Sequence, residues 1–188
     1  MIRSYINNNS ILLTVLFLLV FQYYSVNAQS KTRIEVKGAV LTVNGTKVSM
    51  PCEIIELKKL LGEPDRSIQM ANLISTWDKL GVLTYQANEM SEVESLSVVL
   101  NTADDTDLDF SPKKTFSGEL VIDGVTIKQD MSYARINKSK SGAKFKRAIL
   151  MWKMTNPSLT VYITRALKGQ LTESGKIVVV SISPTGGS

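Results

Sequence analysis

Two short stretches of the chain, LTVNGTKV at residues 41–48 and LVIDGVTI at residues 120–127, are close copies of each other. Each has alternating apolar residues on both sides of an Asn-Gly or Asp-Gly pair. Such a pair is the strongest short-range signal for a β-hairpin, because both turn residues must adopt a positive φ. The sequence therefore predicts two hairpins, one in each half of the chain.

Aromatic residues recur in the same order after the two stretches. Trp77 and Tyr85 follow the first stretch, and Trp152 and Tyr162 follow the second at similar spacing. Recurrence at a near-constant offset is typical of one folding unit used twice. We interpret these aromatics as repeated core positions. The alternative is an exposed aromatic row on a sheet face, which would suit the binding of a peptide, a glycan or a protein.

The segment after the first stretch has the spacing of an amphipathic helix. Ile54, Leu57 and Leu61 fall on one stripe. Gly62 and Pro64 end the helix. Three strands follow, at about residues 73–77, 82–86 and 93–100. The second half repeats this order with a weaker helix at about 130–138 and strands near 148–154, 158–166 and 176–183.

We therefore predict an α+β fold of two tandem repeats, each made of a β-hairpin, one helix and an antiparallel sheet. A sheet needs cover for its apolar face, and in this prediction the helix of each unit provides it. The predicted boundaries are a signal peptide at 1–28, a first repeat unit at 29–100, a linker at 101–114 and a second repeat unit at 115–188.

The N-terminal residues have the organisation of a cleaved signal peptide. Arg3 precedes a short apolar run at residues 11–21, and small residues precede a predicted cleavage site between Ala28 and Gln29. The run is shorter than the roughly 20 residues that span a bilayer, although a retained N-terminal anchor is the alternative. No cysteine for lipid attachment lies at the cleavage site. The sequence thus predicts a secreted or periplasmic protein whose mature chain has no transmembrane helix.

The run Leu60-Leu61-Gly62-Glu63-Pro64 ends a predicted helix just before a predicted antiparallel sheet. In this respect the chain resembles the small outer-membrane lipoprotein family typified by BamE, and a tandem pair of such units resembles the β-lactamase inhibitor proteins. The leading helix and the lipid-bearing cysteine of the lipoprotein family are absent here. The resemblance implies a non-enzymatic binding module whose sheet or loops contact another protein.

The composition excludes several kinds of active site. The chain has no His and a single Cys, which removes His-dependent catalytic triads, Cys/His zinc sites and an intramolecular disulfide. We interpret Cys52 as a buried apolar residue, with a reactive or intermolecular thiol as the alternative. The acidic run with Asp105, Asp107 and Asp109 lacks the glycine and glutamate of a calcium loop, so it reads as a solvated linker, with a looser calcium site as the alternative. We predict no catalytic residues, no cofactor and no metal.

A basic cluster lies in the second half, where the excess of positive charge is concentrated. Its members are Lys138, Lys140, Lys144, Lys146 and Arg147. Such a cluster attracts anionic polymers or ligands, and the alternative interpretation is a solvated basic loop. The predicted export and the lack of a nucleic-acid-binding motif argue against nucleic acid as a partner.

The preferred function is a secreted or periplasmic non-enzymatic binding protein, such as an inhibitor, an immunity factor or an envelope accessory. Its expected partner is another protein in the envelope or outside the cell. The alternative is a binder of envelope polymers or anionic ligands through the basic cluster. An enzyme or ligand carrier that uses carboxylates or a Ser-Lys pair is the least favoured class.

Overall fold

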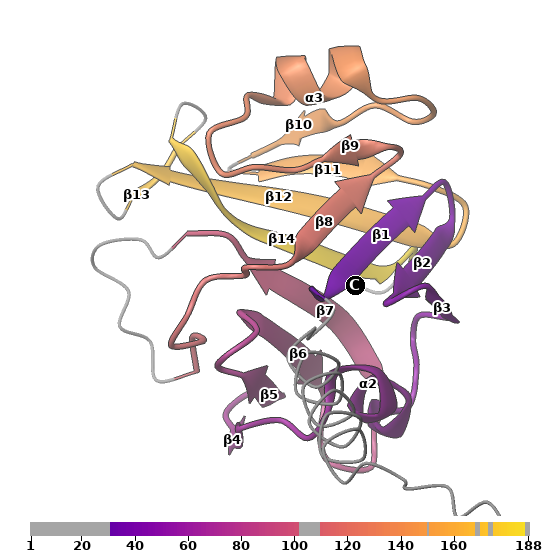
Figure 1. Cartoon of the computed structure of the whole chain (residues 1–188), viewed down its shortest axis with the longest axis vertical. Helices are drawn as coiled ribbons and strands as arrows, with labels where there is room; N and C mark the ends of the chain where they lie inside the picture. The colour runs from indigo at the N-terminus through magenta and orange to yellow at the C-terminus, as the bar shows by residue number, and fades with distance from the viewer. Residues whose placement is uncertain (1–30, 102–109, 150, 168–169, 173–174, 187–188) are drawn as a thin grey trace, which may run out of the picture. The chain divides into compact units, whose positions relative to one another are not determined.

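Two β-sheets form the framework of the described chain (Figure 1). The computed structural model describes residues 31–101, 110–149, 151–167, 170–172 and 175–186. By its contacts, Thr32–Ser188 is one compact unit. The boundaries predicted at residues 101–114 between two repeat units stay a prediction.

The smaller sheet has five strands in the order β3-β2-β1-β8-β9. These strands are β1 (Arg33–Lys37), β2 (Val40–Val43), β3 (Thr46–Val48), β8 (Glu119–Ile122) and β9 (Val125–Thr126). The central strand, β1, pairs antiparallel with β2 and parallel with β8. One strand near the N-terminus thus joins both hairpins in a single sheet.

Both predicted hairpins are confirmed. Leu41 faces Val48 across β2 and β3, and Ile122 faces Val125 across β8 and β9. In each turn both residues have positive φ: 51° and 81° for the Asn-Gly pair, and 47° and 83° for the Asp-Gly pair. This is the backbone that a two-residue turn needs to match the twist of the strands it joins.

The larger sheet has nine antiparallel strands. Its order is β10-β11-β12-β14-β7-β6-β5-β4, with β13 paired to β12. The strands are β4 (Arg66–Gln69), β5 (Leu73–Trp77), β6 (Val82–Gln86), β7 (Val93–Val99), β10 (Lys146–Ala148), β11 (Met151–Thr155), β12 (Leu159–Leu167), β13 (Gln170–Leu171) and β14 (Lys176–Pro184). Strands β7 and β14 form the seam between the two halves of the chain.

The core lies between the two sheets. Ile34 and Val36 of β1 are completely buried, and so are Val161 of β12 and Val180 of β14. All four belong to one apolar cluster that draws residues from both sheets. The sheets therefore pack face to face, and each covers the apolar face of the other.

The prediction of an α+β fold, with a separate sheet and a covering helix in each repeat, is wrong, because the described residues form a mainly-β fold. The described helices, α2 (Ile54–Leu61) and α3 (Tyr133–Ser139), are short, and each buries one side chain, Leu57 and Ile136 respectively. Two turns of helix are too small to cover a sheet, and the second sheet provides the cover instead. No helix within the described ranges is long and apolar enough to cross a membrane.

Asn44, the first turn residue of the β2–β3 hairpin, ties that hairpin to α2. Its Oδ1 accepts a hydrogen bond from the Arg33 N–H at 2.9 Å, and its Nδ2 donates to the Leu60 carbonyl at 2.9 Å. The side-chain amide thus satisfies one of the carbonyls that every helix leaves unpaired at its C-terminal end.

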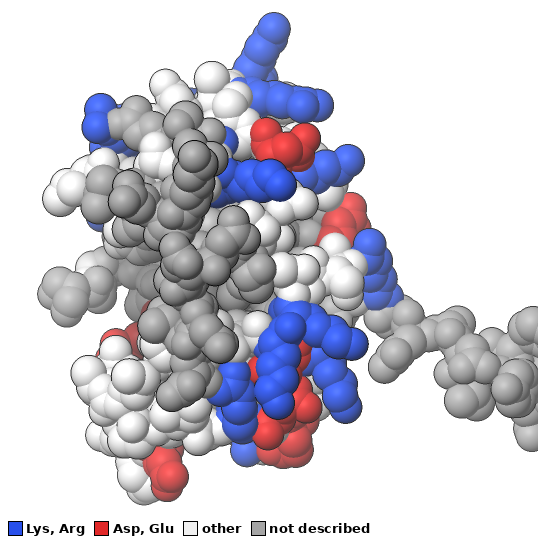
Figure 2. All heavy atoms as spheres, turned by 90° about the vertical axis from the view of Figure 1, so that its left-hand side faces the viewer, with Lys and Arg blue, Asp and Glu red and all other residues white. Residues whose placement is uncertain are grey.

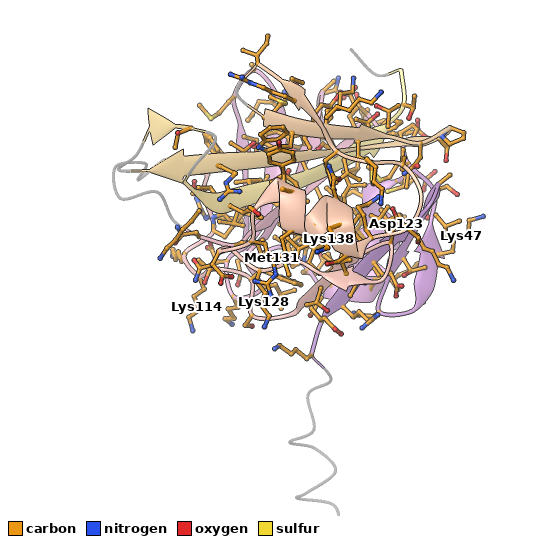
Figure 3. All side chains as sticks on the ribbon, turned by 90° about the horizontal axis from the view of Figure 1, so that it is seen from above. Lys47, Lys114, Asp123, Lys128, Met131 and Lys138 are labelled. Atoms are coloured by element: carbon orange, nitrogen blue, oxygen red, sulfur yellow. The ribbon has the colours of Figure 1, made fainter. Side chains whose placement is uncertain are left out.

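Asp123 is the first turn residue of the β8–β9 hairpin, and its charged side chain ties that hairpin to the end of α3. Its Oδ1 accepts from the Gly38 N–H at 2.7 Å, and its Oδ2 lies 2.8 Å from the Nζ of Lys140, the residue that follows α3. The side chains of Asp123 and Lys140 are 4% and 0% exposed. The Lys140 ammonium also donates to the carbonyls of Ser141 and Ala143. This is a buried ion pair in which the other donors of the lysine are satisfied, whereas the Asp123 Oδ2 accepts no hydrogen bond from the described residues and depends on the charge of the ammonium group. Figure 3 shows Asp123 beside α3.

Asp78, which follows β5, holds the segment that leads to β8. Its carboxylate accepts hydrogen bonds from the Arg66 guanidinium at 3.1 and 3.2 Å and from the Lys113 N–H at 3.0 Å. Burial of the carboxylate opposes its ionisation, but these hydrogen bonds and the charges of Arg66 and Lys113 outweigh burial and lower the pKa of Asp78.

Candidate functional site

The predicted basic cluster divides into one buried lysine and an exposed group. Lys140 lies in the ion pair with Asp123 and contributes nothing to the surface. The other members, Lys138, Lys144, Lys146 and Arg147, are exposed. In Figure 2, Lys and Arg side chains project from the upper end, which carries α3 and β10 in Figure 1.

A groove of about 460 Å³ opens between the α3–β10 connection and strands β10 and β11. We call it the basic groove. Cationic side chains line it together with small ones: Lys144, Lys146, Arg147, Lys153, Ala143, Ala148 and Thr155. The groove therefore brings together three of the five predicted residues and adds a lysine that was not predicted.

Lys146 of β10 and Lys153 of β11 stand directly opposite each other in the antiparallel register. Like charges at facing positions repel and destabilise a sheet. Neither lysine forms an ion pair with a carboxylate of the described chain. The Lys153 Nζ lies 5.6 Å from the centroid of the Tyr162 ring, which is a cation–π distance. The facing positions of the two lysines are thus unfavourable for the sheet, and no carboxylate of the described chain neutralises either charge.

Lys144 is held at the edge of the groove by the end of α3. Its Nζ donates to the carbonyls of Asn137 at 2.7 Å and Lys140 at 2.6 Å. A cation is favoured there because the last carbonyls of a helix carry partial negative charge. Since an ammonium group has three donors, one N–H of Lys144 remains for a ligand in the groove.

Sequence reasoning missed Lys153 because it lies beyond the contiguous basic run. Lys153 enters the groove through the pairing of β10 with β11, in which Lys146 faces Lys153 and Ala148 faces Met151. The sequence gives no signal for this register, because Ile149 is not a turn-forming residue.

The two tryptophans are core residues. Trp77 is 2% exposed, and its Nε1 donates to the Gly62 carbonyl at 2.8 Å, just after α2. Trp152 is 5% exposed and stacks on Tyr133 of α3, with ring centroids 3.7 Å apart and planes 11° apart. Each tryptophan thus fixes the helix of its own half against the larger sheet.

The two tyrosines lie on the other face of that sheet and are half-buried. Tyr85 packs against a second, smaller apolar cluster of Ile74, Leu83 and Val99. Burial raises the pKa of Tyr85 above its ordinary value. Tyr162 of β12 faces Lys153 of β11 across the antiparallel pair. The four predicted aromatics therefore divide into two core residues and two residues of the outer face.

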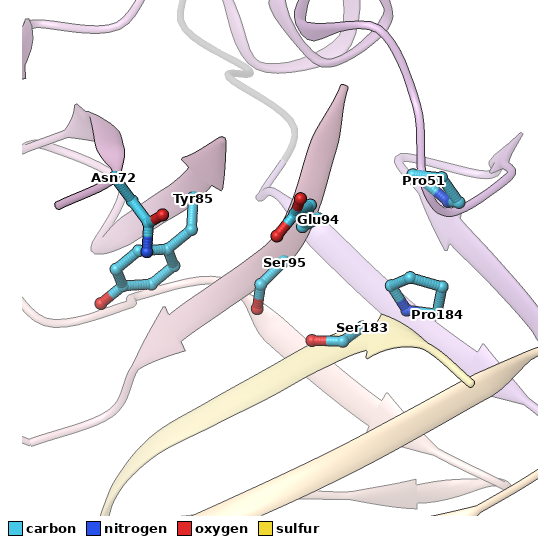
Figure 4. Close-up of a pocket in the computed structure, with 7 residues that line it drawn as sticks. All are labelled: Pro51, Asn72, Tyr85, Glu94, Ser95, Ser183 and Pro184. Atoms are coloured by element: carbon cyan, nitrogen blue, oxygen red, sulfur yellow. The ribbon is translucent and has the colours of Figure 1, made fainter. Parts of the chain in front are cut away.

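A second pocket of about 440 Å³ lies on this outer face at the β7–β14 seam (Figure 4). Its lining is polar apart from two prolines: Pro51, Asn72, Tyr85, Glu94, Ser95, Ser183 and Pro184. Among these described residues Glu94 supplies the one carboxylate, so the pocket has hydrogen-bonding groups but lacks the carboxylate pair that acid–base chemistry on a glycosidic bond uses.

Cys52 is buried, as interpreted from the sequence. It is 3% exposed, and burial, reinforced by Glu56 and Glu92, raises its thiol pKa to about 12. A thiol with so high a pKa is a poor nucleophile. No group of three metal-ligating side chains occurs in the part of the chain that the structure describes. The predicted cleavage site at Ala28 and Gln29 and the acidic run at 105–109 lie outside the described residues.

A model of the family described as "Domain of unknown function (DUF7738)" matches residues 33–137. The chain belongs to this family. The match covers the five-stranded sheet, α2, strands β4 to β7 and most of α3, and the basic groove lies C-terminal to it. No curated protein and no solved structure matches the chain. The resemblance to BamE-like lipoproteins and to β-lactamase inhibitor proteins stays a prediction.

Proposed function

We propose that this is a non-enzymatic binding protein that holds a polyanion of the cell envelope in the basic groove. The observation that carries the proposal is the pair formed by Lys146 and Lys153, which face each other without a described carboxylate between them. Two like charges at facing positions lower the stability of the sheet, and an anionic ligand bound between them would restore it.

A phosphoryl or carboxylate group between the two ammonium groups would replace their repulsion by charge-assisted hydrogen bonds. Lys144 and Arg147, which line the same groove, add positive potential around that position. Cations gathered in this way also raise the rate at which an anionic ligand arrives, and this effect falls as salt is added.

Export to the periplasm or beyond, predicted from residues 1–28, would place the groove among phosphate-bearing envelope polymers. The protein partner preferred from the sequence remains a second outcome of the same test, because an acidic segment would offer carboxylates to the same lysines. Affinity capture from envelope extract, with residues 29–188 as bait, identifies the native ligand of either kind.

The direct test measures binding of fluorescent short-chain polyphosphate by anisotropy at low and at high salt. Lys146→Glu and Lys153→Glu should each weaken binding about ten-fold or more at low salt, since each reversal removes one attraction of roughly 1 kcal/mol and adds a repulsion. Lys47→Glu is the matched control, because Lys47 is exposed on β3 and outside the groove. Equal losses for all three variants would refute a specific site in the groove.

A further inference from the structure

The tip of the β10–β11 hairpin carries an apolar residue in an unfavourable backbone conformation. Ile149 is 87% exposed and has a φ of +52°. A β-branched residue rarely adopts this conformation, and the corresponding turn positions of the β2–β3 and β8–β9 hairpins are Asn44 and Asp123, which tolerate it. Neither the turn nor the core gains from isoleucine here. An observed outlier of this kind is a reason to look for a function.

A second apolar side chain lies next to the tip. Met151, at the start of β11, is 37% exposed. It shares a sheet face with Lys153, because alternate residues of a strand point the same way. The hairpin therefore ends in exposed apolar side chains, with cations immediately behind them.

The distances match the layers of a membrane surface. Lys146 is three residues from Ile149, which corresponds to about 10 Å along an extended strand. Apolar groups of peripheral proteins enter the headgroup and acyl boundary by roughly 5–10 Å. With Ile149 at that depth, Lys146 and its partner Lys153 would lie at the level of the lipid phosphates.

We propose that the β10–β11 hairpin docks on an anionic lipid surface, with Ile149 inserted at the acyl boundary and Lys146 and Lys153 on the headgroups. This rests on the proposed function, whose polyanion it identifies as lipid phosphate. A soluble polymer would use the lysines but would gain nothing from Ile149. A protein partner would need a cavity shaped for a protruding side chain, whereas a bilayer accepts one without a preformed shape.

The test is sedimentation of the mature protein, residues 29–188, with vesicles of phosphatidylcholine alone or mixed with phosphatidylglycerol. Ile149→Asn should fold at least as well as the native protein, because asparagine suits a positive φ. It should partition onto the mixed vesicles about ten-fold less, since it loses the burial of an isoleucine side chain. Met90→Asn is the matched control, because Met90 is 96% exposed in another turn and should leave partition unchanged.

The polyphosphate assay separates the two proposals. Ile149→Asn should bind polyphosphate as the native protein does, whereas Lys146→Glu should lose both polyphosphate and vesicles. Insertion is seen directly with Ile149→Trp, whose emission should shift to the blue on mixed vesicles. The lipid proposal would be overturned if Ile149→Asn did not weaken vesicle binding, or if the native protein bound polyphosphate but not vesicles. Either result would leave the proposed function, the binding of a polyanion in the basic groove, unaffected. If the native protein did not bind polyphosphate, both the proposed function and the lipid proposal would be overturned.

Discussion

The change Asp123→Asn isolates the charge of the buried pair with Lys140. Asparagine keeps the positive φ of the turn and an oxygen to accept the Gly38 N–H, so only the negative charge beside the ammonium is lost. Removing one partner of a buried pair costs about 3–5 kcal/mol, because the other charge stays buried. We expect about 3 kcal/mol, the lower end, because Ser141 and Ala143 still offer carbonyls to Lys140.

Urea unfolding followed by tryptophan fluorescence measures this loss, and the slope with denaturant should not change. The melting temperature should fall by about 6–12 °C, which is what this loss implies for a unit of this size. Removing both charges, with Asp123→Asn and Lys140→Met together, should restore most of the stability.

Glu63→Gln is the matched control, since it makes the same chemical change in a pair with Lys58 in which Glu63 is 74% exposed. An exposed pair of this kind is worth no more than about 1 kcal/mol. If Asp123→Asn and Glu63→Gln cost the same, the Asp123–Lys140 pair is not a buried contact that stabilises the fold, and our assignment of Lys140 to the interior fails.

Three further expectations concern other contacts. Asn44→Asp should destabilise by about 1–2 kcal/mol in urea, because it replaces the donor to Leu60 by a negative charge at a helix end. The pKa of Asp78 is lowered in the folded protein, so its ionised form stabilises the fold above about pH 4, and this contribution is lost as the pH falls further. In Asp78→Asn the free energy of unfolding should therefore fall less steeply as the pH is lowered below about 4. Cys52 should react with iodoacetamide roughly a thousand-fold more slowly in the native protein than in urea, and equal rates would contradict its burial.

Local elements were predictable from the sequence because their signals are local. The two hairpin turns, the end of α2 at Gly62, and strands β5 and β6 all follow from patterns within a few residues. The assembly of these elements was not predictable in the same way. The parallel pairing of β1 with β8 and the seam between β7 and β14 join residues far apart in the chain, and alternation within a strand does not name its partner.

The site shows the same division between local and distant information. Lys140 belongs to the same basic run as Lys138 and Lys144, and only its distance from Asp123 distinguishes it as an interior residue. Conversely, Lys153 joins the groove through the hairpin register. Composition therefore located a basic surface in the right region, whereas tertiary contacts decided which cations remain on it.

The parallel β1–β8 pair and the β7–β14 seam have a consequence during synthesis. When residue 100 has left the ribosome, β1 and β7 still lack the neighbours that β8 and β14 will supply. At about 5–20 residues per second, β8 is complete within roughly 1–4 seconds, whereas β14 is complete only after about 4–17 seconds, so the edge of β7 stays open for on the order of ten seconds. Open edges are templates for pairing with other chains. The yield of folded protein should therefore depend on preventing association between nascent chains, and prematurely terminated chains should aggregate.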